Sequence, residues 1–167
     1  MKVSIVCATS LDGYLNPKLE MSPEWTSVED KKLFAIQTKQ AGVIVMGDNT
    51  FKYSFDNQPL AGRWNVVVTH HTDREVENVW FTDGEPKEIL KQIEEKGHSE
   101  VMIIGGSIIN SLFMNAGLVT DLYITVTSHI FGGGIPLFGK LDKAFDLELL
   151  DTRPLGPGEI LNHYKVI

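Results

Sequence analysis

The residues with the clearest potential for chemistry are an acid and two aromatic residues near the start of one predicted helix. Asp30 follows Trp25 by five residues and precedes Phe34 by four. A carboxylate in the first turn of a helix has a purely structural explanation, since it bonds free backbone amides and favours the helix dipole. In an apolar cleft the same carboxylate would instead bind the polar edge of a flat heterocycle, and desolvation would raise its pKa. The spacing alone is compatible with both interpretations.

Two glycine turns form a second candidate site. Gly47 follows the apolar run 43–46, and the pair Gly105–Gly106 follows the apolar run 101–104. Each turn opens a predicted helix, where glycine lets the backbone approach a pyrophosphate and the helix N-terminus supplies oriented N–H groups. Neither turn matches the glycine fingerprint of the dinucleotide-binding fold or the phosphate loop, and a turn that starts a helix needs no ligand to explain it. Two such turns on adjacent parallel strands would nevertheless share one crevice at the carboxyl ends of those strands.

The segment Gly132–Phe138 is a third candidate, because it is too rich in glycine for the interior of a strand. We expect either a glycine-rich hairpin loop or a loop that fits closely around a ring or a sugar phosphate. The histidines show none of the short spacings of zinc or iron ligands, so no metal site is predicted. A serine hydrolase is also disfavoured, because the chain lacks a G-x-S-x-G motif.

Composition limits the classes of protein to consider. The 167 residues are 43% hydrophobic, which suits a single domain over residues 1–167. The 22 acidic residues outnumber the 15 basic ones, and without a basic run we expect neither nucleic acid nor an anionic membrane as a partner. No signal-peptide core or membrane span is evident, so a cytoplasmic protein is expected. Cys7 is the only cysteine and is interpreted as a small buried hydrophobic residue.

The elements that would position these residues alternate between strand and helix through the first two thirds of the chain. This rhythm predicts a largely parallel sheet with helices on both faces. Predicted strands cover 3–8, 43–46, 65–69, 79–82 and 101–104, and predicted helices cover 27–41, 86–96 and 107–115. From Thr120 onward apolar and polar residues alternate, which indicates antiparallel strands that complete the same sheet.

Several motifs, taken in order, resemble successive blocks of the dihydrofolate reductase-like superfamily. They are Ala8–Gly13, Trp25–Asp30 with Phe34, Val45–Gly47 with Thr50–Phe51, Ile103–Ser107, Gly117–Leu122 and Gly133–Phe138. The last three are most similar to the reductase domain of the riboflavin-pathway deaminase–reductases and to its stand-alone relatives. The likeness covers nearly the whole chain, and its specificity comes from the ordered series.

The resemblance implies a three-layer α/β/α fold with a mixed, mainly parallel central sheet and antiparallel C-terminal strands. It further implies that NADPH lies across the carboxyl edge of the sheet and that hydride goes to a bound pterin or pyrimidine. Asp30 would be the substrate-binding acid and Thr125 the residue that bonds it, so these two are the expected catalytic residues. The expected cofactor-binding residues are Ala8, Leu15, Gly47, Asp48, Thr50, Thr69, His70, Gly105, Gly106, Ser107 and Ile108. The expected substrate-binding residues are Trp25, Phe34, Gly133, Pro136 and Leu137.

Two departures from the family pattern bear on the ligands. Asp48 stands where the family usually has an arginine after Met-Gly, and a carboxylate repels a 2′-phosphate instead of pairing with it. NADPH is the coenzyme that the resemblance implies, and NADH is the alternative that Asp48 opens. The loop Gly133–Phe138 fits riboflavin-type relatives and not true folate reductases.

We therefore predict an NADPH-dependent oxidoreductase similar to the 5-amino-6-(5-phosphoribosylamino)uracil reductase of riboflavin biosynthesis. Its partner would be a small-molecule substrate, and a homodimer is expected because dimers are common among similar proteins. One alternative is a true dihydrofolate reductase. Another is a ligand-binding protein that kept the fold and lost hydride transfer.

Overall fold

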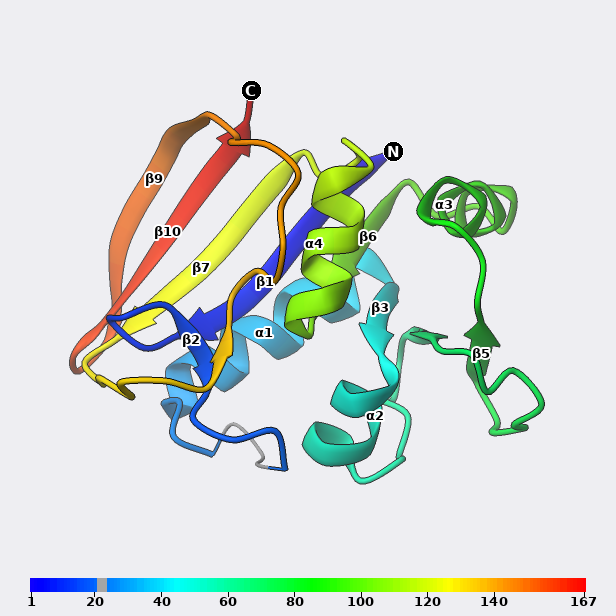
Figure 1. Ribbon diagram of the computed structural model, residues 1–167, viewed down its shortest axis with the longest axis horizontal. Coiled ribbons are helices and arrows are strands. Elements are labelled where there is room, and N and C mark those ends of the chain that lie inside the picture. The colour runs from blue at the N-terminus through cyan, green and yellow to red at the C-terminus, as the bar shows by residue number, and fades with distance from the viewer. Residues whose placement is uncertain (21–23) are drawn as a thin grey trace.

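In the computed structural model, which describes residues 1–20 and 24–167, eight strands form one sheet in the order β5-β4-β3-β6-β1-β7-β10-β9 (Figure 1). A separate two-stranded sheet pairs β2 with β8. The strands are β1 (Lys2–Thr9), β2 (Tyr14–Asn16), β3 (Val43–Gly47), β4 (Trp64–Val68), β5 (Val79–Thr82), β6 (Glu100–Ile103), β7 (Asp121–Thr127), β8 (Ile135–Pro136), β9 (Leu147–Gly156) and β10 (Glu159–Val166). The helices are α1 (Val28–Ala41), α2 (Asp48–Phe55), α3 (Pro86–Glu95) and α4 (Ser107–Asn115).

The sheet is parallel except at its C-terminal edge, which confirms the predicted mixed, mainly parallel architecture. β1 pairs in parallel with both β6 and β7, and β3 pairs in parallel with β4 and β6. β10 runs antiparallel to β7 and to β9. The change of direction therefore falls between β7 and β10, although the alternation of apolar and polar residues begins at β7.

Helices cover both faces of the sheet, as the predicted three-layer fold requires. Successive residues of the buried strands point to opposite faces, so each strand supplies two apolar layers. One layer joins Val45 of β3 to Ile89 of α3 and Phe113 of α4, and the other joins Met46 to Phe51 of α2. Figure 1 shows α4 in front of the sheet and α1 behind it.

The helix starts differ in a way that matters for the site. α1 is capped by Ser27, whose Oγ accepts a hydrogen bond from the backbone N–H of Asp30 at 3.0 Å. α2 and α4 begin after Gly47 and Gly106, and neither cap residue has a side chain that can bond the free N–H groups of the first turn. These two helix N-termini therefore keep their donors for other partners.

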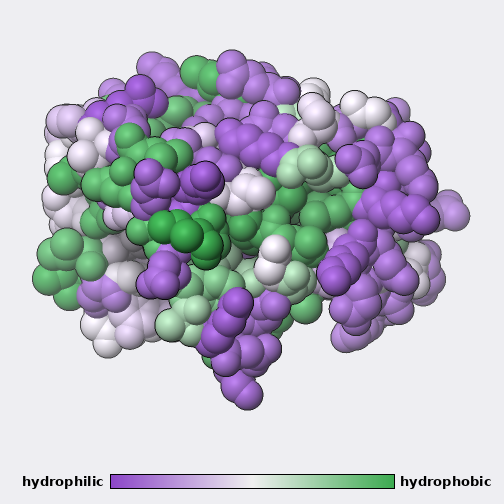
Figure 2. All heavy atoms as spheres, turned by 90° about the horizontal axis from the view of Figure 1, so that it is seen from above, coloured by the Kyte–Doolittle hydropathy of each residue, from purple (hydrophilic) through white to green (hydrophobic). Residues whose placement is uncertain are grey.

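The outer surface is hydrophilic where α3 lies. This helix buries Ile89, Leu90 and Ile93 and turns its charged residues outward. In Figure 2, hydrophilic residues gather at the end of the molecule that α3 occupies in Figure 1. None of the helices in the described part of the chain has the length and apolar content that a bilayer crossing requires.

Candidate active site

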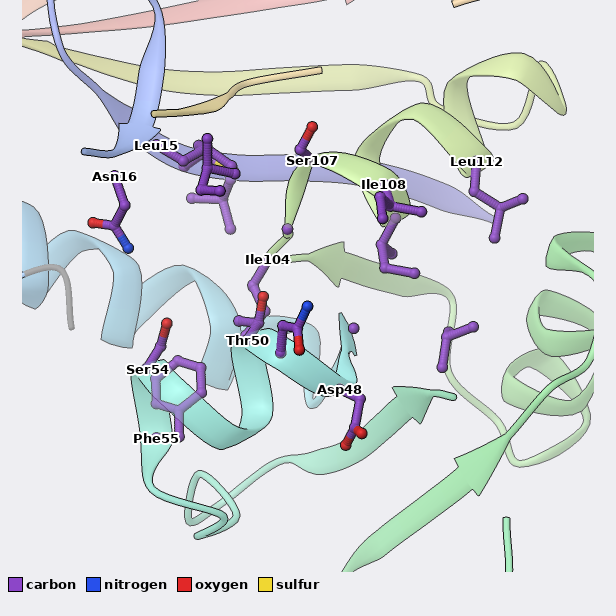
Figure 3. A pocket seen from close by; sticks show the side chains of 18 of the residues that line it. Leu15, Asn16, Asp48, Thr50, Ser54, Phe55, Ile104, Ser107, Ile108 and Leu112 are labelled. Carbon is purple, nitrogen blue, oxygen red and sulfur yellow. The ribbon is translucent and has the colours of Figure 1, made fainter. Parts of the chain in front are cut away.

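A cleft of about 1010 Å³ opens at the carboxyl ends of β1, β3, β4 and β6. Such a volume is at the upper end of the range of small-molecule sites, which is about 300–1,000 Å³. Thirteen of the residues predicted for the site line it: Ala8, Leu15, Asp30, Phe34, Gly47, Asp48, Thr50, Thr69, His70, Gly106, Ser107, Ile108 and Pro136. Figure 3 shows Asp48 and Thr50 projecting from α2 on one side of the cleft, Ile108 and Leu112 projecting from α4 on the other, and Ile104 beside Thr50.

The two glycine turns converge at the floor of this cleft. The N–H of Gly47 donates to the carbonyl of Gly105 at 2.9 Å, and the N–H of Ile104 donates to Val45 at 2.9 Å. The Gly105–Gly106 peptide bond is cis. A Cβ on Gly47 would lie 2.9 Å from the side chain of Ile109, so the close approach of the turn to α4 requires glycine. The N-termini of α2 and α4 therefore open onto the same space, where their free N–H groups suit an anion.

Asp30 projects into the apolar part of the cleft from the first turn of α1. Burial raises the pKa of its carboxyl; a hydrogen bond with Thr125 opposes this rise, and the nearby charge of Glu159 adds to it. Thr125 is buried on β7 and does not line the cleft, but its side chain is hydrogen-bonded to the Asp30 carboxyl. The acid and Phe34 lie one helical turn apart and both face the cleft.

Three of the predicted substrate-binding residues are placed outside the cleft lining. Trp25 donates from Nε1 to Asn16 Oδ1 at 2.8 Å and makes edge contacts with the rings of His129 and Phe131. Leu137 packs into the core, and its carbonyl accepts from Asn110 at 2.9 Å. Gly133 is in the same loop and does not line the cleft either. Pro136 and its neighbour Ile135 are the members of this loop that do.

Asp48 is paired with a residue that the sequence analysis did not single out. Arg74 donates from Nη1 to Asp48 Oδ1 and from Nη2 to Asn57 at 3.1 Å. Its guanidinium also lies over the ring of Phe81, 4.4 Å from the centroid. Arg74 lies 26 residues from Asp48 in a loop, so no local spacing could have indicated the pair.

Other residues of the cleft were also missed, and some carried a usable signal. Ser54 follows Thr50 by four residues on α2 and therefore shares its face. Phe55 and Lys31 are adjacent in sequence to cleft residues. Asp83 and Glu85 enter from the loop after β5 and had no such signal.

Cys7 lines the cleft, but its chemistry is that of a neutral thiol. Burial raises the pKa of Cys7 to about 12, while a weak bond from Asn110 Nδ2 at 3.7 Å has the opposite effect. Thiolate nucleophilicity is therefore suppressed at neutral pH. In the described residues, no three histidine, cysteine, aspartate or glutamate side chains come together as metal ligands would.

Comparison with known proteins gives a family match over most of the chain. The dihydrofolate reductase family model matches residues 2–147. The uncharacterized protein YyaP of Bacillus subtilis (strain 168) is 22% identical, with 98% of this chain and 95% of YyaP covered.

Two solved structures show the same fold. A protein from Shewanella sp. PV-4 named for riboflavin biosynthesis aligns with a TM-score of 0.81 and 24% identity, over 100% of this chain and 99% of that one. The dihydrofolate reductase of Enterococcus faecalis, solved with NADP(H) and RAB-propyl, aligns with a TM-score of 0.80 and 24% identity, over 99% and 96% of the two chains. The expected superfamily and fold are thus confirmed.

Proposed function

Because the chain belongs to the dihydrofolate reductase family, we propose that it is a reductase that uses a nicotinamide dinucleotide to reduce a pterin- or pyrimidine-like substrate. The observation that supports this most strongly is the convergence of three features on one cleft. These are the uncapped N-termini of α2 and α4 and the half-buried carboxyl of Asp30.

The residues present suit a dinucleotide. The turns at Gly47 and Gly106 would hold the pyrophosphate, since both offer backbone N–H groups that no cap residue occupies. Backbone at Ala8 and Leu15 would hold the carboxamide. When bound, the reduced nicotinamide supplies a hydride, and the protein contributes orientation and exclusion of water.

Asp30 is the group that would fix the acceptor. Its carboxyl, held by Thr125, can bond the polar edge of a heterocycle and hold a proton there, since its pKa is raised by burial. Phe34 and Phe55 offer apolar contact to the ring. The cleft thus separates a polar hydrogen-bonding edge from apolar walls.

The end of the cleft at Asp48 bears on the choice between NADPH and NADH. Arg74 compensates the charge of Asp48 but is committed to it, and Asp83 and Glu85 add two carboxylates to the lining of the same cleft. A dianionic 2′-phosphate gains little from such a surface, whereas a carboxylate can bond a free ribose hydroxyl. We therefore expect NADH to bind comparably to NADPH.

Two substrate classes follow from the comparisons. Similarity to the Shewanella protein named for riboflavin biosynthesis supports a substrate from that pathway. Within it, the resemblance of the sequence motifs to the riboflavin-pathway reductases favours a substrate like 5-amino-6-(5-phosphoribosylamino)uracil. Similarity to the E. faecalis enzyme supports dihydrofolate as the second candidate. We favour the first because the sequence of the Gly133–Phe138 loop resembles that of riboflavin-type relatives.

The test combines binding with turnover. Tryptophan fluorescence, titrated with NADPH and NADH, measures binding, and loss of absorbance at the reduced nicotinamide band measures oxidation in the presence of each substrate. Binding with turnover of one substrate is expected. Binding without turnover of either would favour the non-catalytic alternative, and absence of binding would refute the proposal.

A further inference from the structure

A second carboxylate, outside the cleft lining, is buried beneath the start of α1. Glu159 is 5% exposed and is the first residue of β10. It pairs with Thr127 of β7 on one side and with Gly156 of β9 on the other. A buried acid needs strong hydrogen-bond partners to offset its desolvation.

The partner of Glu159 is the cap residue of α1. Its Oε1 accepts from the backbone N–H of Ser27 at 2.9 Å, and its Oε2 accepts from the hydroxyl of Ser27. Because the hydroxyl proton is given to Glu159, the lone pairs of Ser27 Oγ are left for the backbone N–H of Asp30, 3.0 Å away. A continuous path of hydrogen bonds therefore leads from Glu159 to the backbone of Asp30.

The hairpin that carries Glu159 fits closely against the same helical turn. A Cβ on Gly156 would lie 3.3 Å from the carboxylate of Glu29 and 3.5 Å from its Cβ. The turn between β9 and β10 is itself bonded to the residue that follows β7, since Ser128 Oγ donates to the carbonyl of Gly158 at 2.7 Å. Figure 1 shows this turn of the β9–β10 hairpin at the end of the sheet where α1 begins.

Nearby charges also act on the Asp30 carboxyl. Glu159 faces Asp30 from β10 and disfavours its ionised form, while Lys31 on α1 favours that form. Cys7 on β1 also faces Asp30 and is a neutral thiol. Of the two charged groups that act on the Asp30 carboxyl, Lys31 is basic and Glu159 is acidic.

We propose that Glu159 is a positioning residue for Asp30: through its two hydrogen bonds with Ser27 it fixes the first turn of α1 and so holds the Asp30 carboxyl in the cleft. The inference rests on the proposed reductase function for its catalytic meaning, but the coupling of the two acids does not depend on that function.

The experiment follows the titration of Asp30 directly. In protein labelled with ¹³C at the aspartate carboxyls, the Asp30 signal is assigned by its loss in Asp30→Asn, and its midpoint is compared between the natural protein and Glu159→Gln. Glutamine keeps the shape and an acceptor for Ser27 but removes the charge. The midpoint of Asp30 is expected to move to lower pH. The acid limb of the pH profile of turnover should move in the same direction.

Glu29→Gln is the matched control, because it removes an exposed carboxylate from the same turn without touching Ser27. An unchanged midpoint in Glu159→Gln, or an equal displacement in Glu29→Gln, would overturn the proposal. If Glu159→Gln does not fold, Ser27→Ala serves instead: it breaks the hydrogen-bonded path between the two acids, so the Asp30 midpoint should again move, and an unchanged midpoint would count against the proposal. A protein that shows the coupling but reduces no substrate would refute the proposed function alone.

Discussion

At the scale of single residues, Asp30 should favour function at the expense of stability. Its pKa is 3.8 in an ordinary setting and is raised on folding, chiefly by burial. Protons are therefore held more tightly by the folded state, and stability falls as pH rises from 3.8 through the raised value. Asp30→Asn should raise the melting temperature at neutral pH, and this gain should vanish in acid.

The same variant should lose turnover by about 100-fold or more, because a group that bonds the substrate and moves a proton is removed. Dinucleotide affinity should change little. Thermal melts across pH, together with steady-state kinetics, provide the measurement. A variant that loses dinucleotide affinity as strongly as turnover would contradict the role assigned to Asp30.

Asp48→Asn tests the coenzyme. The change frees Arg74 from its ion pair and removes a charge that repels a 2′-phosphate. A hydrogen bond to a charged group is worth about 1.5–3 kcal/mol, so NADPH affinity relative to NADH should rise by roughly tenfold or more. Arg74→Gln is the opposite control, since it leaves Asp48 uncompensated and should weaken NADPH more than NADH. A ratio of the two dissociation constants that stays constant across both variants would argue against a ribose site at this end.

At the scale of elements, the small β2–β8 sheet lines part of the cleft, and its geometry depends on one glycine. Gly134 has φ 129, and a Cβ there would lie 2.2 Å from the backbone oxygen of Asn16. Both strands contribute to the lining, through Leu15 and Asn16 on one side and Ile135 and Pro136 on the other. A side chain at 134 would therefore force the two strands apart.

Gly134→Ala should accordingly weaken binding of dinucleotide or substrate by about tenfold, since misplacement of a cleft wall disturbs its contacts. The melting temperature should change less than the binding affinity, because this pair of strands is separate from the main sheet. Titration and thermal melts distinguish the two effects. Gly132→Ala, in the same loop but with open space around its Cβ, is the comparison, although its own φ of 69 carries some strain. Equal effects of the two variants on binding would show that steric contact with Asn16 is not the cause.

Sequence patterns predicted the helices and strands well where apolar residues recur at a regular spacing. They predicted the site residues poorly where the site depends on contacts between distant loops. The apolar strands and the two glycine turns were recognisable, and the parallel order of β3 and β6 brings those turns together. Trp25 shows the opposite case. The resemblance implied that it binds substrate, yet its ring makes edge contacts with His129 and Phe131 outside the cleft lining.

Arg74 and Glu159 could not have been predicted, because each contacts the site across a long sequence separation. Arg74 reaches Asp48 over 26 residues, and Glu159 reaches Ser27 over 132. Single-sequence periodicity carries no information about such pairs. The antiparallel return of β10 beside β7 is what places Glu159 at the start of α1.

At the scale of the whole molecule, ligand binding should be coupled to global stability. The cleft is lined by the ends of four parallel strands and by three helices, so a ligand there contacts elements that unfold together. A dinucleotide at about 100 times its dissociation constant should stabilise the fold by about 2.7 kcal/mol. For a chain of this size that corresponds to a rise of roughly 5–10 °C in melting temperature.

Adenosine, which lacks the pyrophosphate that the N-termini of α2 and α4 would hold, should give a much smaller rise at equal concentration. An equal rise with adenosine would place the stabilising contacts elsewhere, and no rise with either dinucleotide would mean that the convergent helix N-termini do not form a dinucleotide site.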